Sequence, residues 1–197
     1  MKALLALQHQ SIQMAGNVGS IIRKLAVAAT VLISAPVIGL GVYDVVAVQP
    51  RLGQVRKILQ DAPGQDANPP SLVRKMIDAN SGSPSGDATS MVIGRIYAPQ
   101  STSPRWHMRE ALWRVLLPLH VGREGMYGLY ATLAFNGTDH GLTAYASREF
   151  GKPLDQLSAS QAAATVAVTY FPSAYSRDRE RLNRRAEAIL GRSGISP

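Results

Sequence analysis

The sequence predicts an all-α protein with a single apolar segment near its N-terminus. Three observations support this prediction. Apolar residues recur at helical spacing, as at positions 52, 55, 58 and 59. Ser103-Pro104 is a typical helix start, with proline at the first helical position. Ser158 and Gln161 form the S-x-x-Q pattern of a capping box.

Several expected helices are bounded by recognisable signals. Pro63-Gly64 ends the first one, and Asp178 and Glu180 complement the dipole at the start of the last one. The small polar run ANSGSPSGDAT at 79–89 predicts a loop, and the short apolar run 91–97 fits no single type. We expect helices at 51–62, 71–78, 103–120 with an interruption near Pro118, 123–135, 142–150, 157–169 and 177–190.

Composition limits the classes of function. The 197 residues suffice for one modest domain, and the absence of cysteine excludes disulfides and thiolate metal sites. Cysteine usage leaves the redox compartment open. A net charge of +8 suits an anionic partner such as phosphate, an acidic bilayer or nucleic acid, although it equally suits a solubilising surface.

The apolar segment runs from Leu25 to Tyr43 without a charged residue, and residues 45–48 extend it. As a helix, its uncharged part rises about 28 Å, close to the hydrocarbon thickness of a bilayer. Lys2, Arg23 and Lys24 precede it, which places the N-terminus in the cytoplasm. We therefore expect a single-pass anchor at 25–48. A signal peptide and a buried globular helix are the two alternatives.

The run from Gly137 to Tyr175 resembles the closing part of a family 51 glycosyltransferase domain. The family polymerises peptidoglycan from lipid-linked disaccharide and includes the N-terminal half of bifunctional penicillin-binding proteins. Its patterns are a glycine turn, Y-F-G-K, L-[ST]-x-x-E-A-A and P-x-x-Y. The matching residues here are Gly137, Gly141-Leu142, Ala144, Phe150-Gly151-Lys152, Leu157-Ser158, Gln161-Ala162-Ala163, Pro172 and Tyr175. The resemblance implies a lysozyme-like fold.

Extending the resemblance upstream assigns site residues. It places Glu110 at the glutamate of the third motif, R-K-x-x-E, and His107 at the lysine of that motif. Arg123 falls at the lysine of a later motif, K-x-x-I-L-E-x-Y-L-N, where Gly128 replaces the glutamate and Tyr130 keeps the tyrosine. The resemblance therefore implies a catalytic role for Glu110 and phosphate contacts for His107 and Arg123.

The glutamate that serves the family as catalytic base has no counterpart. Alignment of residues 72–77 with the helix before that motif puts Asn80 at its position, and an amide cannot take up the proton. The nearby carboxylates Asp78 and Asp87 lie outside the family's motif context. The second family motif, G-[AG]-S-T-[IL]-T-Q-Q, is also missing.

Each assigned residue also has a structural interpretation. Glu110 could pair with Arg114 one helical turn on, and His107 and Arg123 could simply face solvent. Asp139 beside His140 suggests an acid–base pair, yet such neighbours are common in loops. The histidines lack metal-ligand spacing, so no metal site is predicted. The arginine-rich C-terminal run lacks interleaved aromatics, which argues against a nucleic-acid partner.

Three hypotheses follow for function. The first is a degenerate, membrane-anchored glycosyltransferase-like domain that binds lipid-linked precursor, glycan or a cell-wall synthesis protein. The second is an active, divergent glycosyltransferase, for which the resemblance implies a divalent metal; no other cofactor is expected. The third is a peptidoglycan-binding component of an envelope machine. The expected organisation is a cytoplasmic segment at 1–24, the anchor at 25–48 in a bacterial inner membrane, a juxtamembrane helix and linker at 49–70, and a periplasmic domain at 71–197.

Overall fold

The structure, a computed structural model, describes residues 24, 32, 34–97, 103–175 and 177–195. The chain divides into two compact units, Met1–Val46 and Ala47–Pro197. In the first unit residues 34–43 are helical, and apolar side chains such as Val37 and Ile38 are exposed. Within the described part of the chain, no helix is both long and apolar enough to cross a membrane. The predicted anchor at 25–48 lies partly outside the described residues, because 25–31 and 33 are not among them.

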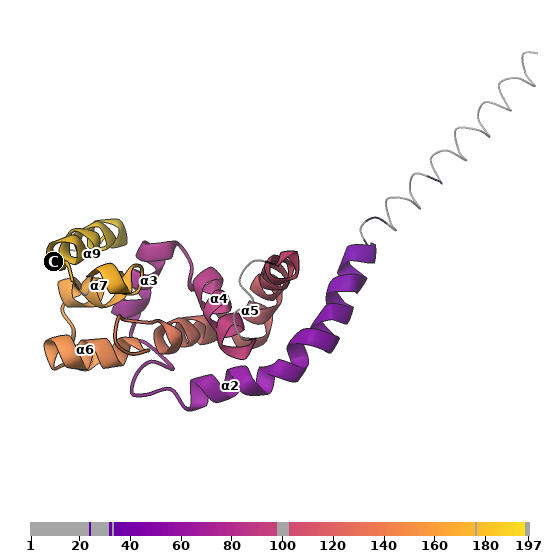
Figure 1. Cartoon of the computed structure of the whole chain (residues 1–197), viewed down its shortest axis with the longest axis horizontal. Coiled ribbons are helices and arrows are strands. Elements are labelled where there is room, and N and C mark those ends of the chain that lie inside the picture. The colour runs from indigo at the N-terminus through magenta and orange to yellow at the C-terminus, as the bar shows by residue number, and fades with distance from the viewer. Residues whose placement is uncertain (1–23, 25–31, 33, 98–102, 176, 196–197) are drawn as a thin grey trace, which may run out of the picture. The chain divides into compact units, whose positions relative to one another are not determined.

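The all-α prediction is confirmed for the described residues, which contain no strand (Figure 1). A π-helical turn, η1 (Asp44–Val48), and a 3-10 turn, η2 (Gln49–Arg51), precede the helices of the second unit. These helices are α2 (Leu52–Gln60), α3 (Ser71–Ser81), α4 (Pro84–Ile96), α5 (Pro104–Leu133), α6 (Leu142–Phe150), η3 (Leu154–Gln156), α7 (Ala159–Ala167), α8 (Pro172–Tyr175) and α9 (Arg179–Ser193).

The loop predicted at 79–89 is wrong. Helix α3 continues to Ser81 and ends at Gly82, whose φ of 76° suits glycine. Ser83 then caps α4 by accepting a hydrogen bond from the Ser85 amide, and Pro84 occupies the first turn. Ser83-Pro84 is thus the same helix start as Ser103-Pro104, hidden in a run of small polar residues. The apolar run 91–97, left without a type, belongs to α4 up to Ile96.

Helix α5 breaks at Gly122, between the helices predicted at 103–120 and 123–135, whereas the interruption predicted near Pro118 is absent. Gly122 has φ 69° and ψ 172°, a backbone conformation that is strongly unfavourable for every residue except glycine. Pro118 lies inside the preceding helical part. The two parts of α5, 104–121 and 123–133, are therefore separate helices in their backbone geometry.

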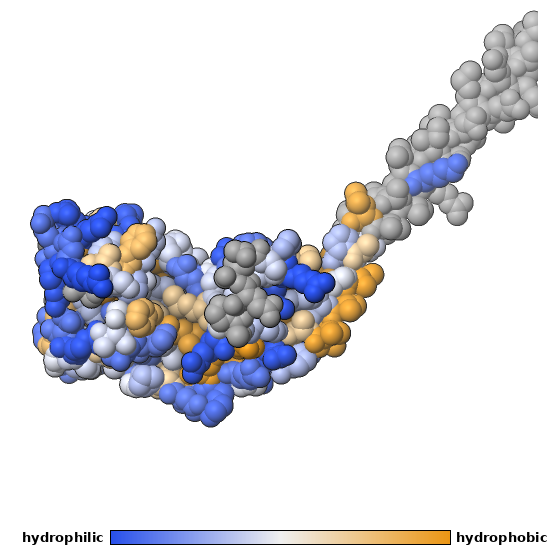
Figure 2. Space-filling model, in the orientation of Figure 1, coloured by the Kyte–Doolittle hydropathy of each residue, from blue (hydrophilic) through white to orange (hydrophobic). Residues whose placement is uncertain are grey.

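Two groups of helices build the second unit. Helices α3, α7 and α9 pack against one another, and α4 packs along α5 (Figure 1). The capping box predicted for α7 is present, with Ser158 accepting from the Gln161 amide and Gln161 accepting from the Ser158 amide. Asp178 is the N-cap of α9 and accepts a hydrogen bond of 2.9 Å from the Arg181 amide. Hydrophilic side chains cover α9 in Figure 2.

The segment 63–68 is pinned against the second part of α5 and the start of α6. The buried carboxylate of Asp66 accepts hydrogen bonds from the Thr143 amide at 2.9 Å and the Thr143 hydroxyl at 2.8 Å. Next to it, the Ala67 carbonyl approaches Gly128 so closely that a Cβ there would lie 2.3 Å from the carbonyl oxygen. Arg74 of α3 donates hydrogen bonds to Asn68 Oδ1 and, at 2.6 Å, to the Pro69 carbonyl, which tie the end of this segment to α3.

Candidate functional site

A cleft of about 380 Å³ opens where α3, α4, α5 and α9 meet. We call it the Asn80 cleft. Helix α3 contributes Asn80, and α4 contributes Asp87 and Ser90. Tyr130 comes from α5 and Arg185 from α9, so elements far apart in the sequence form one site. The remaining lining residues are Ser81, Met91, Thr169 and Tyr170.

Tyr130 forms the buried floor of this cleft, with 1% of its surface exposed. Its hydroxyl lies 2.8 Å from Thr169 Oγ1, which itself donates to the Val166 carbonyl. Tyr130 therefore donates this hydrogen bond, since the Thr169 proton is already used. Burial raises the pKa of the Tyr130 phenol, so the group stays a neutral hydroxyl.

Arg185 and Asn80 form one wall. Arg185 Nη2 donates a hydrogen bond of 2.7 Å to Asn80 Oδ1, and the guanidinium carbon lies 4.4 Å from the centre of the Tyr170 ring. Among the described residues no carboxylate pairs with Arg185, and its buried Nε has no hydrogen-bond partner. The wall thus carries a positive charge held by an amide and an aromatic face.

Asp87 is the one carboxylate that lines the Asn80 cleft. Its side chain is exposed and makes no hydrogen bond or ion pair with the described residues. Positive Arg185 and negative Asp87 therefore both border the same hollow. Such a mixed polar lining can hydrogen-bond hydroxyl and amide groups of a ligand.

Glu110 lies behind this cleft, not in it. Ser90 donates a hydrogen bond to Glu110 Oε1, and Arg114 Nη2 donates to the same oxygen at 2.7 Å. The hydrogen bond from Ser90, followed by the interaction with Arg114, lowers the pKa of Glu110 below its usual value. A carboxylate stabilised in this way is a weak base. The predicted pairing of Glu110 with Arg114 is present.

His107 and Arg123 lie apart from each other. His107 is exposed on α5, one helical turn before Glu110. Arg123 follows the break at Gly122, and its Nη2 donates to Asp78 Oδ2 at 3.1 Å. Within the described residues no hydrogen bond or ion pair joins Arg123 to Glu110 or His107, and none of the three lines the Asn80 cleft.

Asp78 is bound by two neighbours on α5. The hydroxyl of Tyr127 lies 2.7 Å from Asp78 Oδ1 and 2.6 Å from Oδ2, and Arg123 adds its ion pair. This network ties α3 to the second part of α5. Asp78 is therefore occupied as a structural acceptor, which weakens it as a candidate base.

Gly128, at the position of a motif glutamate in the resemblance, cannot be replaced without movement of the backbone. A Cβ there would lie 2.3 Å from the Ala67 carbonyl oxygen and 2.8 Å from Leu59 Cδ2. Real Cβ atoms do not approach other atoms so closely. The Ala67 carbonyl and the Leu59 side chain occupy the space that a side chain at position 128 would need.

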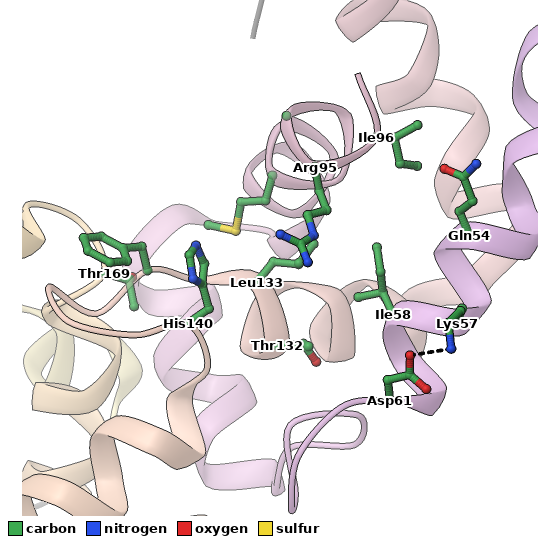
Figure 3. Close-up of a pocket in the computed structure, with 13 residues that line it drawn as sticks. Gln54, Lys57, Ile58, Asp61, Arg95, Ile96, Thr132, Leu133, His140 and Thr169 are labelled. Atoms are coloured by element: carbon green, nitrogen blue, oxygen red, sulfur yellow. Dashed lines mark ion pairs between the residues drawn. The ribbon is translucent and has the colours of Figure 1, made fainter. Parts of the chain in front are cut away.

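A second hollow, of about 830 Å³, adjoins the Asn80 cleft through the shared lining residues Met91 and Thr169. We call it the His140 groove. In Figure 3, Arg95 reaches toward it from α4, His140 from the turn after α5, and the Lys57–Asp61 ion pair of 2.8 Å borders it on α2. Ile58 and Leu133 are among its apolar lining residues.

The suggested acid–base pair of Asp139 and His140 does not form. Asp139 Oδ2 accepts a hydrogen bond of 2.9 Å from Arg148 Nη1, whereas the His140 ring tilts against Phe135 at 5.3 Å between centres. Asn136 organises this turn by accepting from the amides of Thr138 and Asp139. Among the described residues, no group of three or more His, Asp or Glu gathers that could hold a metal ion.

Sequence reasoning missed Arg185 and Tyr170. Arg185 was taken as one member of an arginine-rich helix, yet it neighbours the buried positions Leu182, Ala186 and Ile189 in the helical repeat. The exposed Arg179 borders the same stripe in this repeat, so the local pattern alone does not separate Arg185 from the arginines around it. Tyr170 carries no local signal either.

No known family model matches this chain, and no curated protein matches it either.

Proposed function

We propose that this chain is a membrane-anchored, peptidoglycan glycosyltransferase-like domain that binds glycan or its lipid-linked precursor without transferring sugar. The observation that carries the proposal is Asn80. The resemblance assigns this position to the catalytic base, and here an amide lines the cleft with its oxygen held by Arg185. An amide in that place can bind a sugar hydroxyl but cannot accept its proton.

The neighbouring carboxylates do not supply an obvious substitute. Asp78 does not line the Asn80 cleft and accepts hydrogen bonds from Tyr127 and Arg123. Glu110 has a lowered pKa and points to Ser90 rather than into the cleft. The catalytic base is replaced by an amide, and there is no room for a side chain at position 128. Both observations support a cleft that can bind a ligand but has no group to catalyse sugar transfer.

The lining of the cleft suits a polar ligand with an apolar face. Arg185 and Asn80 offer hydrogen bonds, and the Tyr170 ring, 53% exposed, offers a flat apolar surface. Sugar rings combine hydroxyl groups with apolar C–H faces, so glycan matches this combination. A cell-wall synthesis protein is the other partner of the proposal.

The direct test is binding of soluble peptidoglycan glycan fragments to the purified full-length protein. Arg185→Lys keeps the charge but loses the planar contact with Tyr170, so we expect affinity to fall about tenfold. Arg184→Lys is the matched control, because Arg184 pairs with exposed Glu180 away from the cleft. Equal affinity of both variants and the natural protein would remove the cleft from the proposal.

One observation favours a second function. Asp87 lies in the cleft with no partner among the described residues, so an active, divergent glycosyltransferase would use it as base. Polymerisation of lipid-linked disaccharide decides between the two. We expect no glycan chains from the natural protein. Chains that disappear in Asp87→Asn, while glycan binding persists, would establish the active alternative.

A further inference from the structure

The first part of α5, residues 104–121, is apolar on two opposite faces. Its inner face buries Trp113, Leu116 and Leu117 against the rest of the second unit. Its outer face exposes Met108 by 62%, Val115 by 54% and Leu119 by 75%. The apolar residues of the inner face are explained by packing against the described residues. The apolar residues of the outer face have no such packing partner among them.

The outer residues form one continuous row. Met108, Ala111, Val115 and Leu119 follow one another at intervals of three or four residues, so they lie above one another on the helix. All four are exposed. We call this row the outer stripe of α5. A contiguous row of apolar side chains on a water-exposed surface marks an interaction site.

Basic side chains stand at both borders of the outer stripe, and the one at position 114 is paired with Glu110. At 100° per residue, Arg105 lies on one border and Arg114, with His107, on the other. The one acidic residue in 104–121, Glu110, is turned inward toward Ser90 and pairs with Arg114. No negative charge therefore stands on the exposed face of this helical part.

We propose that the outer stripe of α5 lies in the interface of an anionic lipid bilayer. An apolar row between basic borders is the arrangement of an interfacial helix, whose apolar side chains enter the acyl boundary while arginine contacts headgroups. A second copy of the chain fits less well, because facing stripes would bring basic borders together. The proposal concerns a different surface from the Asn80 cleft and does not depend on glycan binding.

Fluorescence quenching in vesicles tests this placement. The chain has no cysteine, so Val115→Cys and Ala188→Cys give single labelling sites on the outer stripe and on the exposed side of α9. Each labelled full-length protein is mixed with vesicles of equal parts phosphatidylcholine and phosphatidylglycerol that carry a quencher on the acyl chains. We expect at least threefold stronger quenching at position 115 than at 188.

Two further measurements separate a bilayer contact from its competitors. With phosphatidylcholine alone, or with Arg105→Glu in the Val115→Cys protein, quenching at 115 should fall by at least half. Equal quenching at 115 and 188, or quenching at 115 that ignores lipid charge, would overturn the proposal. So would a label at 115 that is already shielded from a water-soluble quencher without lipid, because a second copy or another segment would then cover the stripe.

Discussion

The two parts of α5 have opposite surroundings although they are joined at Gly122. After the break, residues 126–131 are buried one after another, and α2 and the 63–68 segment enclose them. Before the break, every third or fourth residue is apolar and exposed. The difference teaches that hydrophobicity alone does not identify the core of this protein. The enclosed part serves packing, and the open part keeps an exposed apolar surface.

The largest contrast should come from the same substitution in both parts. Leu129→Ala removes a fully buried side chain and leaves a cavity, so we expect the free energy of unfolding to fall by about 2–5 kcal/mol. Leu119→Ala removes an exposed side chain and should change it by less than about 0.5 kcal/mol. Urea denaturation of both variants measures the difference. Similar losses would mean that Leu119 is packed.

Gly128 tests how tightly the second part of α5 is enclosed, because alanine adds only one methyl group there. Gly128→Ala places a methyl group 2.3 Å from the Ala67 carbonyl oxygen, so the 63–68 segment must move. We expect a loss of about 3 kcal/mol, at the upper end for overpacking. Denaturation of the purified variant tests this value. A variant as stable as the natural protein would show that Ala67 does not press on α5.

The same segment makes stability depend on pH. Burial raises the pKa of Asp66 to about 6 from 3.8, despite hydrogen bonds from Thr143 that lower it. The folded protein therefore binds this proton more tightly than the unfolded chain. Its contribution to stability is greatest below about pH 4 and declines by about 2–3 kcal/mol as pH rises through 6.

Asp66→Asn isolates that contribution, because the amide does not titrate. The free energy of unfolding of the natural protein minus that of the variant should increase as pH falls from 7 to 4. Denaturation at several pH values gives the difference directly. A difference that is flat, or that grows toward high pH, would contradict a buried carboxyl with a raised pKa.

The smallest effect concerns a glycine in open surroundings. No atom lies within 4 Å of a Cβ built at Gly191 in α9, in contrast to Gly128. Gly191→Ala should therefore stabilise the protein by about 0.5–1 kcal/mol, since alanine loses less backbone freedom on folding. A thermal melt detects the gain. Destabilisation would indicate that α9 makes a contact at this position.

Locally encoded features could be predicted from the sequence. Helix α6 was predicted with both of its bounds, since Gly141 and Gly151 adopt positive φ at its two ends. The capping box of α7 depends on two residues three positions apart. Such signals act within one turn of chain. The prediction of a loop at 79–89 was wrong because serine, glycine and proline occur both in loops and at helix starts.

The candidate site could be predicted only in part. Asn80 was placed by the resemblance, and it does line a cleft. Arg185 and Tyr170 reach that cleft because α9, and α7 with the turn that follows it, pack against α3, which no local pattern encodes. Likewise, nothing near Gly128 in sequence announces the Ala67 carbonyl. Which residues line the cleft therefore depends on long-range packing, which the spacing of residues in the sequence does not reveal.

The hydrogen bond between Asn80 and Arg185 joins residues 105 positions apart. A ribosome that adds about 5–20 residues per second completes α3 roughly 5–20 s before Arg185 exists. During that interval the emerging chain has the amide but lacks the wall that orients it. The cleft is thus assembled late in synthesis, and a newborn chain cannot hold a ligand there before its arginine helix has docked.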